Sequence, residues 1–196
     1  MLRILTTLAA IGAVSTPALA DDHADYGVNF GFSPFGGSVG LIYNHTASTS
    51  FNVAFGGAPA SDAPFKLDID GTEYTQNGGS SWMGFFLNHR PFEDSQWFRI
   101  NTGIGIGGIE GTLTNDAGDE YAVEYNENPV GYIGVGFGNG TAEGFTFGFD
   151  IGGLFGSGPT IIANEENEGD DLDAIKDNAF FGNILPNFQL TVGYNF

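Results

Sequence analysis

The most informative part of this sequence is Pro186-Asn-Phe-Gln-Leu-Thr-Val-Gly-Tyr-Asn-Phe196. From Phe188 onward every second residue is apolar or aromatic, and the residues between are polar or small. This period of two predicts a β-strand with one apolar and one polar face. In water, an unpaired strand edge beside an apolar face invites aggregation. In a closed membrane barrel the apolar face meets lipid and both edges are paired. The stretch therefore predicts the closing strand of such a barrel.

This ending resembles the last strand of Gram-negative outer-membrane β-barrels, where a terminal Phe with aromatic or apolar residues at alternate positions is typical. The resemblance implies that these alternate residues form an assembly signal for the barrel-assembly machinery. In this chain they are Phe188, Leu190, Val192, Tyr194 and Phe196.

The first twenty residues have the pattern of a signal peptide. Arg3 places a positive charge in the first segment, residues 4–14 are mostly apolar, and Ala18-Leu19-Ala20 is a small-x-small cleavage pattern. The apolar run is too short to cross a membrane. We expect a cleaved signal peptide over 1–20, with Ala18 and Ala20 at the cleavage site, and an exported barrel domain over 21–196.

The amino-acid composition excludes several classes of functional site and partner. The 196 residues include 32 glycines and 19 phenylalanines but no cysteine, which excludes disulfides, thiolate metal sites and cysteine nucleophiles. With 24 acidic and 5 basic residues, the chain cannot assemble a basic patch for nucleic acid. An acidic surface is compatible with divalent cations, which bridge carboxylates and lipopolysaccharide phosphates. Solubility of the loops is the alternative reason for it.

The same alternation recurs along the chain, punctuated by Gly, Pro, Asn and Asp. We predict an all-β fold: a single antiparallel barrel of eight strands, an even number as bacterial barrels require. The predicted strands cover about residues 25–33, 38–46, 50–58, 72–90, 97–113, 121–138, 145–156 and 186–196.

The lengths of the links between these strands test the prediction of a barrel. With both termini in the periplasm, the periplasmic turns are 47–49, 91–96 and 139–144, all short. The outer links are 34–37, 59–71, 114–120 and 157–185, and two of them are long. This asymmetry is typical of outer-membrane barrels. Residues 65–75 have a second interpretation, a hairpin of their own around Asp70-Gly71.

Four segments carry a resemblance to a known family: Asp70-Gly-Thr-Glu-Tyr74, Pro129-Val-Gly-Tyr-Ile-Gly-Val-Gly136, Phe147-Gly-Phe-Asp-Ile-Gly152 and the acidic 165–177. The chain resembles small outer-membrane barrels of the OmpA-transmembrane, OmpX, OmpW and opacity-protein type, and proteobacterial outer-membrane proteins with these segments. The resemblance implies an eight-stranded barrel and transfers no catalytic residue or cofactor.

Three charged residues fall on the predicted lumen face: Arg90, Arg99 and Asp150. An eight-stranded barrel is just wide enough for its side chains, and isolated charges inside it need partners. We expect an Arg99–Asp150 or an Arg90–Asp150 pair. Its role is structural, or that of a gate or selectivity pair in a pore.

Some barrels of this size modify lipids, which would need a Ser, His and acid set. The histidines are His23, His45 and His89. His45 and His89 lie near predicted periplasmic turns, away from the outer leaflet, and His23 is at the mature terminus. We therefore predict no enzymatic activity and no cofactor.

The densest charge cluster is 164–177. With Gly169 as the sixth residue of a calcium loop, the twelfth is Ile175 rather than Glu, so the spacing is not that of an EF-hand. We expect a solvated loop, with weak Ca²⁺ or Mg²⁺ binding as the alternative. The spacing of Leu172, Ile175 and Ala179 predicts a short helix over 170–180 that caps the barrel.

Together these features predict a monomer in the Gram-negative outer membrane, in contact with lipid and lipopolysaccharide. The leading interpretation is a non-enzymatic barrel with acidic extracellular loops and a structural or surface-interaction role. The alternative is a narrow, porin-like channel for small solutes or ions.

Overall fold

The computed structural model describes residues 23–63, 66–92, 95–126, 128–164, 171–178 and 181–196. The expected signal peptide, with Ala18 and Ala20, lies outside these ranges. Within them, no helix has both the length and the apolar character needed to cross a bilayer.

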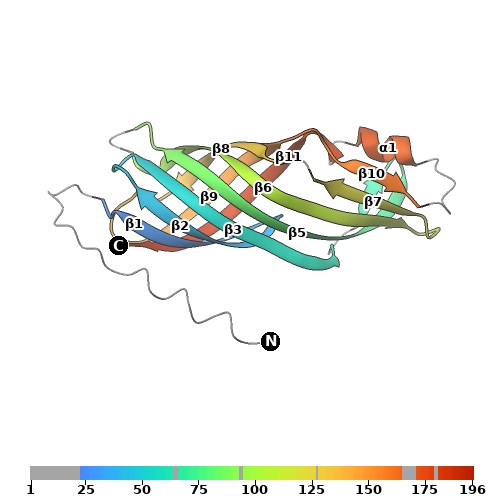
Figure 1. The fold of residues 1–196 in the computed structure, drawn as a ribbon, viewed down its shortest axis with the longest axis horizontal. Coiled ribbons are helices and arrows are strands. Elements are labelled where there is room, and N and C mark those ends of the chain that lie inside the picture. Colours follow the sequence, from blue (N-terminus) through green and yellow to red (C-terminus); the bar gives the residue numbers. More distant parts are fainter. Residues whose placement is uncertain (1–22, 64–65, 93–94, 127, 165–170, 179–180) are drawn as a thin grey trace, which may run out of the picture.

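Eight antiparallel strands close into a barrel, which confirms the predicted fold (Figure 1). They follow one another around the ring in chain order, and the last pairs with the first. The ring strands are β1 (Tyr26–Ser33), β2 (Gly36–Asn44), β3 (Thr49–Asp62), β5 (Thr72–His89), β6 (Phe98–Asn115), β8 (Val130–Gly138), β9 (Gly144–Phe155) and β11 (Ile184–Asn195).

The terminal stretch closes the ring. β11 pairs with β9 over its full length and with β1 from Leu190 to Asn195. The backbone of Phe196 extends this seam: its N–H donates to the Tyr26 carbonyl at 2.8 Å, and the Tyr26 N–H donates back at 3.2 Å. β11 therefore has a hydrogen-bonded neighbour along each edge, β9 on one side and β1 on the other, as the alternating sequence predicted.

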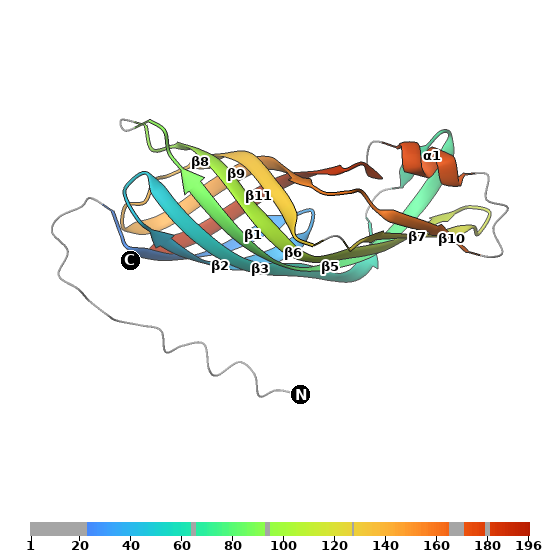
Figure 2. The ribbon, with the colours of Figure 1, turned by 45° about the horizontal axis from the view of Figure 1, so that its top comes forward.

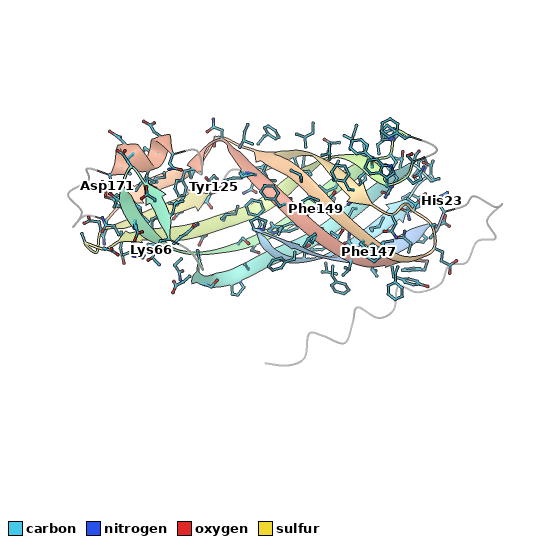
Figure 3. The ribbon with its side chains drawn as sticks, turned by 180° about the vertical axis from the view of Figure 1, so that it is seen from behind. His23, Lys66, Tyr125, Phe147, Phe149 and Asp171 are labelled. Carbon is cyan, nitrogen blue, oxygen red and sulfur yellow. The ribbon has the colours of Figure 1, made fainter. Side chains whose placement is uncertain are left out.

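The outer surface of the ring is a band of apolar side chains. Phe30, Phe147 and Leu190 keep 61%, 65% and 61% of their surface exposed. Figure 3 shows Phe147 and Phe149 among the side chains on the barrel wall. Each ring strand contributes at least one exposed apolar residue: Phe30, Leu41, Phe51, Phe85, Ile104, Ile133, Phe147 and Leu190. A wall of this composition suits lipid rather than water.

The links differ at the two ends of the barrel. At the end that holds Tyr26 and Phe196, called the terminal end, the strands join through residues 45–48, 90–97 and 139–143. At the opposite end, β1 and β2 join through Pro34-Phe35 alone, with Gly36 at a φ of +93°. The other links at that end are long, so the predicted asymmetry is confirmed.

A separate lobe extends from the end opposite the termini (Figures 1 and 2). β5 and β6 continue beyond the ring, and β4 (Leu67–Ile69), β7 (Glu120–Tyr125) and β10 (Thr160–Ala163) pair beside them. The strand order in the lobe is β10-β7-β6-β5-β4. The short helix α1 (Leu172–Asp177) completes it. The turn between β4 and β5 is the Asp70-Gly71 hairpin, with φ values of +50° and +86° as a type I′ turn requires.

The lobe has its own apolar core. Tyr74, Leu113, Tyr121 and Ile175 are almost completely buried there. The rings of Tyr74 and Tyr121 meet edge to face, with centroids 6.1 Å apart. The remaining buried members of the core are Ile69, Val123, Ile161 and Phe181. Two expectations for 164–177 therefore need correction: its last residues form α1 rather than a solvated loop, and α1 buries Ile175 in the lobe core instead of capping the barrel. Residues 165–170 and Ala179 lie outside the described residues.

The predicted sixth strand, 121–138, is wrong as one strand. It divides into β7 and β8, which pair with different parts of β6. Pro129 stands at the break and has no N–H to donate to a strand ladder. The side-chain oxygen of Asn128 accepts the Gly107 N–H at 2.6 Å, where β6 changes partner. This break lets β7 leave the ring and build the lobe.

Candidate functional site: the polar lumen and the acidic lobe

The barrel lumen holds a cavity of about 180 Å³. Asn44 and Asn195 line it near the terminal end, and Asn183 and Gly158 line it near the lobe. Among the described residues, nine asparagines contribute to the lining: Asn29, Asn44, Asn52, Asn88, Asn101, Asn139, Asn183, Asn187 and Asn195. An amide both donates and accepts hydrogen bonds, so this wall suits small polar solutes. Apolar side chains such as Phe86, Leu154 and Leu185 line the cavity as well, so the lumen is less polar than the alternation predicted.

Arg99 of β6 and Asp150 of β9 form an ion pair inside the lumen. The Arg99 Nε and Nη2 donate to the two Asp150 carboxylate oxygens at 3.1 and 2.6 Å. Asn101 Nδ2 also donates to Asp150 Oδ1. Inward-facing glycines on the flanking strands make room, because a Cβ at Gly136 or Gly148 would lie 2.6 Å from an Arg99 nitrogen. The structure thus brings together Arg99 and Asp150, one of the two pairs that the sequence left open.

Arg90 is not part of that pair. Its side chain lines the same cavity and is only 7% exposed, immediately after β5. Among the described residues, no hydrogen-bond partner faces its Nε or Nη1. The β5–β6 register ends at His89 opposite Ile100, and its continuation places Arg90 opposite Arg99. Two guanidinium groups and one carboxylate therefore lie in this part of the lumen, and the carboxylate bonds to Arg99.

An aromatic contact lies over Gly103 of β6, on the lobe side of the ion pair, and sequence reasoning missed it. The rings of Phe86 and Tyr132 meet edge to face, with centroids 5.5 Å apart. The Tyr132 hydroxyl lies over Gly134 and Gly152, where a Cβ would come within 2.7 and 2.5 Å. Glycines at inward positions of neighbouring strands are thus the sequence signal that marks where a large inward side chain lies.

The β1–β2 turn is held at the mouth of the barrel by β5. Trp82 Nε1 and Ser80 Oγ both donate to the Phe35 carbonyl, at 3.0 and 2.8 Å. Trp82 and Phe35 also line the cavity. The lumen is therefore bounded by a fixed turn at the lobe end, although that turn is only two residues long.

The histidines lie at the terminal end, as predicted. The His45 ring packs against Tyr43 and Phe51, with centroids 6.2 and 6.4 Å away. His89 Nδ1 hydrogen-bonds to Thr49 Oγ1 at 3.1 Å. In Figure 3, His23 lies at the end of the molecule opposite the lobe. The contacts of His45 are those of an aromatic girdle.

The residues of the predicted assembly signal all face outward. Their exposed fractions range from 39% to 61%, so they belong to the lipid-facing band: Phe188, Leu190, Val192, Tyr194 and Phe196. Tyr194 packs edge to face on Phe145 of β9, with centroids 5.2 Å apart. This arrangement suits an interfacial aromatic girdle.

The lobe carries a charged network on its surface. Lys66 Nζ donates to Asp116 at 2.9 Å and to Glu73 at 3.4 Å, and these carboxylates raise the Lys66 pKa. The Tyr74 hydroxyl donates to Asp171 at 2.5 Å. Burial and then this hydrogen bond raise the Tyr74 pKa above its usual value. Lys66, Tyr125 and Asp171 mark the lobe in Figure 3. Among the described residues, no three acidic or histidine side chains gather as a metal site.

Several solved structures share this architecture. CarO of Acinetobacter baumannii aligns with a TM-score of 0.67 and 13% identity, over 91% of this chain and 100% of that one. The fold is that of a small outer-membrane β-barrel. CarO2 of the same organism aligns with a TM-score of 0.70 and 16% identity, over 89% and 99% of the two chains.

A major outer membrane protein of Thermus thermophilus aligns with a TM-score of 0.55 and 14% identity, over 87% of this chain and 98% of that one. Protein-family models and curated proteins gave no match. The likeness therefore establishes the architecture, and the function has to be argued from the lumen and the lobe.

Proposed function

We propose that the protein is a non-enzymatic outer-membrane barrel that presents the lobe outside the cell as an interaction surface. The observation that carries this proposal is the apolar core of the lobe, in which Tyr74, Leu113, Tyr121 and Ile175 are almost completely buried. A link that serves only solubility needs no such core. A rigid lobe instead holds its surface groups in fixed positions, which lowers the entropic cost of binding.

The charge of the lobe indicates a cationic partner. Acidic side chains are exposed around the lobe, among them Asp68, Asp70, Glu73 and Asp116. Complementary charge speeds association and selects partners. Divalent cations that bridge these carboxylates to lipopolysaccharide phosphates belong to the same proposal. We further propose that the chain is a monomer, is exported through a signal peptide and is inserted by the barrel-assembly machinery.

A cationic probe tests the interaction role. We would measure the binding of a labelled lysine octapeptide to the purified protein in detergent by fluorescence anisotropy. The lobe variant Asp68→Asn/Asp70→Asn should bind more weakly. Asn keeps the local turn geometry at both positions, because it tolerates the positive φ of residue 70 and its side-chain oxygen at residue 68 can still accept the Gly71 N–H. The control Asp25→Asn/Glu143→Gln removes the same charge from exposed positions at the terminal end. Equal weakening in both variants would show that net charge, not the lobe, attracts the probe.

A narrow channel is the second candidate, and the cavity favours it because residues near both ends of the barrel line it. Planar-bilayer recording separates the two functions. Steady, ion-selective steps that vanish in an Arg99→Ala/Asp150→Ala variant would favour the channel. Silent bilayers with a correctly folded protein would leave the interaction role.

A further inference from the structure

The lumen has an excess of positive charge, although the whole chain has a net charge of −19. Among the described residues, the charged side chains that line the cavity are Arg90, Arg99 and Asp150. The balance inside the barrel is thus opposite to that of the lobe surface. This local excess identifies the lumen as a place where an anion would be stabilised.

Asp150 is already engaged by its neighbours. Its Oδ2 accepts from Arg99 Nη2, and its Oδ1 accepts from both Arg99 Nε and Asn101 Nδ2. Bidentate guanidinium–carboxylate pairs of this kind are strong and directional. The carboxylate therefore neutralises Arg99 and leaves the charge of Arg90 without a direct counterpart.

Arg90 has the features of an unfilled anion anchor. It is only 7% exposed, and neither its Nε nor its Nη1 has a hydrogen-bond partner among the described residues. Among the described residues that line the cavity, the other charged side chains are the like charge of Arg99 and the occupied Asp150. Like charges opposite each other on paired strands are destabilising, and a buried charge without a partner is costly. An anion beside Arg90 would relieve both costs.

We propose that Arg90 anchors a lumenal site for one small oxyanion, namely the carboxylate or phosphate group of a small solute. Arginine is suited to this because its planar guanidinium matches the geometry of both groups. The asparagines along the cavity, such as Asn52 and Asn88, would bind the polar remainder of the solute. A cavity of about 180 Å³ limits the ligand to a few heavy atoms. This site does not depend on the proposed role of the lobe.

The sequence makes a direct test practicable. Apart from Arg3 in the expected signal peptide, the arginines are Arg90 and Arg99. A protein labelled with ¹⁵N at arginine Nε should therefore give two side-chain signals in detergent micelles, assigned with Arg90→Lys. Acetate and inorganic phosphate would be titrated separately at constant ionic strength set with choline chloride. We expect one or both to move the Arg90 signal saturably in the millimolar range or below, while Arg99 stays fixed. Acetate alone would assign a carboxylate site, and phosphate alone a phosphate site.

Two variants make the test decisive. Arg90→Gln should lose the single bound anion measured by equilibrium dialysis with radiolabelled acetate or phosphate. Asp150→Asn should release Arg99, so that both arginine signals respond. The proposal is overturned if neither anion moves the Arg90 signal, if both arginines respond equally in the unmodified protein, or if a folded Arg90→Gln variant binds as much anion. If Arg90→Gln does not fold, the titration of the unmodified protein still decides.

Discussion

Inward-facing glycines set where the large lumen side chains can lie. Gly136 of β8 lies under the Arg99–Asp150 pair, where a Cβ would overlap Asp150 Oδ1 and lie 2.6 Å from Arg99 Nε. Gly131 of the same strand has no heavy atom within 4 Å of its Cβ position. Gly131 shares a face of β8 with the outward residues Ile133 and Val135, so it serves as the control for Gly136 on the same strand.

Gly136→Ala should destabilise the barrel by about 1–3 kcal/mol, the usual cost of overpacking a filled interior. Gly131→Ala should change the free energy of unfolding by less than about 0.5 kcal/mol. Urea unfolding in detergent, followed by heat-modifiable gel migration, measures both. Equal stability of the two variants would show that the ion pair has room to shift and that Gly136 is not required under it.

Tyr74, in the lobe core, donates a hydrogen bond to Asp171. Because the Tyr74 pKa is raised, the stability of the folded state depends on pH through this residue. An unfolded tyrosine ionises near pH 10, whereas the folded one stays protonated to higher pH. The folded state then binds more protons than the unfolded state, so stability is retained below about pH 10 and declines above it.

Tyr74→Phe should lower lobe stability at pH 8 by about 1–2 kcal/mol through the lost hydrogen bond. It should also flatten the decline between about pH 10 and 12, since no phenol remains to ionise. Near-UV circular dichroism in a urea series reports the lobe tyrosines. Tyr43→Phe, on the exposed outer wall, is the control and should leave both quantities unchanged. An unaltered pH profile in Tyr74→Phe would contradict the account.

Among the elements, most strands of the ring were predictable, whereas in the lobe the sequence indicated the Asp70-Gly71 hairpin but not β7 or β10 as lobe strands. Period-two alternation is the direct consequence of a strand that has lipid on one face and the lumen on the other. For this reason the observed bounds of β1, β2, β9 and β11 lie within about two residues of the predicted ones. β4, β7 and β10 are short, and their apolar residues face a core made by distant segments. A pattern read along one segment cannot show that core.

The candidate site was predictable to a similar degree. Alternation placed Arg90, Arg99 and Asp150 on the lumen face, and the need for a counter-charge predicted a pair. The choice between the two arginines depends on strand register, which the sequence does not specify to within one residue. β6 pairs Arg99 with Gly136, and β8 pairs Gly136 with Asp150, so Arg99 and Asp150 meet across a glycine.

β11 should be required for assembly more than for stability. Deleting Phe196 removes one exposed ring from the lipid-facing wall, worth about 2 kcal/mol, and the two backbone bonds to Tyr26. We expect the folded amount in cells to fall much more than the urea midpoint of the purified protein. Quantitative blotting of heat-modifiable protein in membrane fractions measures the first quantity. Equal amounts of the deleted and intact proteins would mean that this residue is not part of an assembly signal.

Over the whole molecule, one chain forms two parts, the ring and the lobe, whose interiors differ in polarity. The ring is apolar outside and holds amide and charged side chains inside, whereas the lobe buries an apolar core beneath charged side chains. The first arrangement is stable in a bilayer and the second in water. Their position along one axis means that the membrane surrounds the ring and leaves the lobe in solvent (Figure 2).

The direction of the lobe is the central claim, and the absence of cysteine makes it measurable. Ala47, in a turn at the terminal end, and Ala117, in the lobe, are both exposed. Ala47→Cys and Ala117→Cys would be treated with a membrane-impermeant maleimide in intact and in permeabilised Gram-negative cells. If the lobe faces outward, Ala117→Cys labels in intact cells and Ala47→Cys labels only after permeabilisation. Labelling of Ala47→Cys in intact cells with Ala117→Cys protected would contradict an outward lobe, and equal protection of both would contradict a surface location.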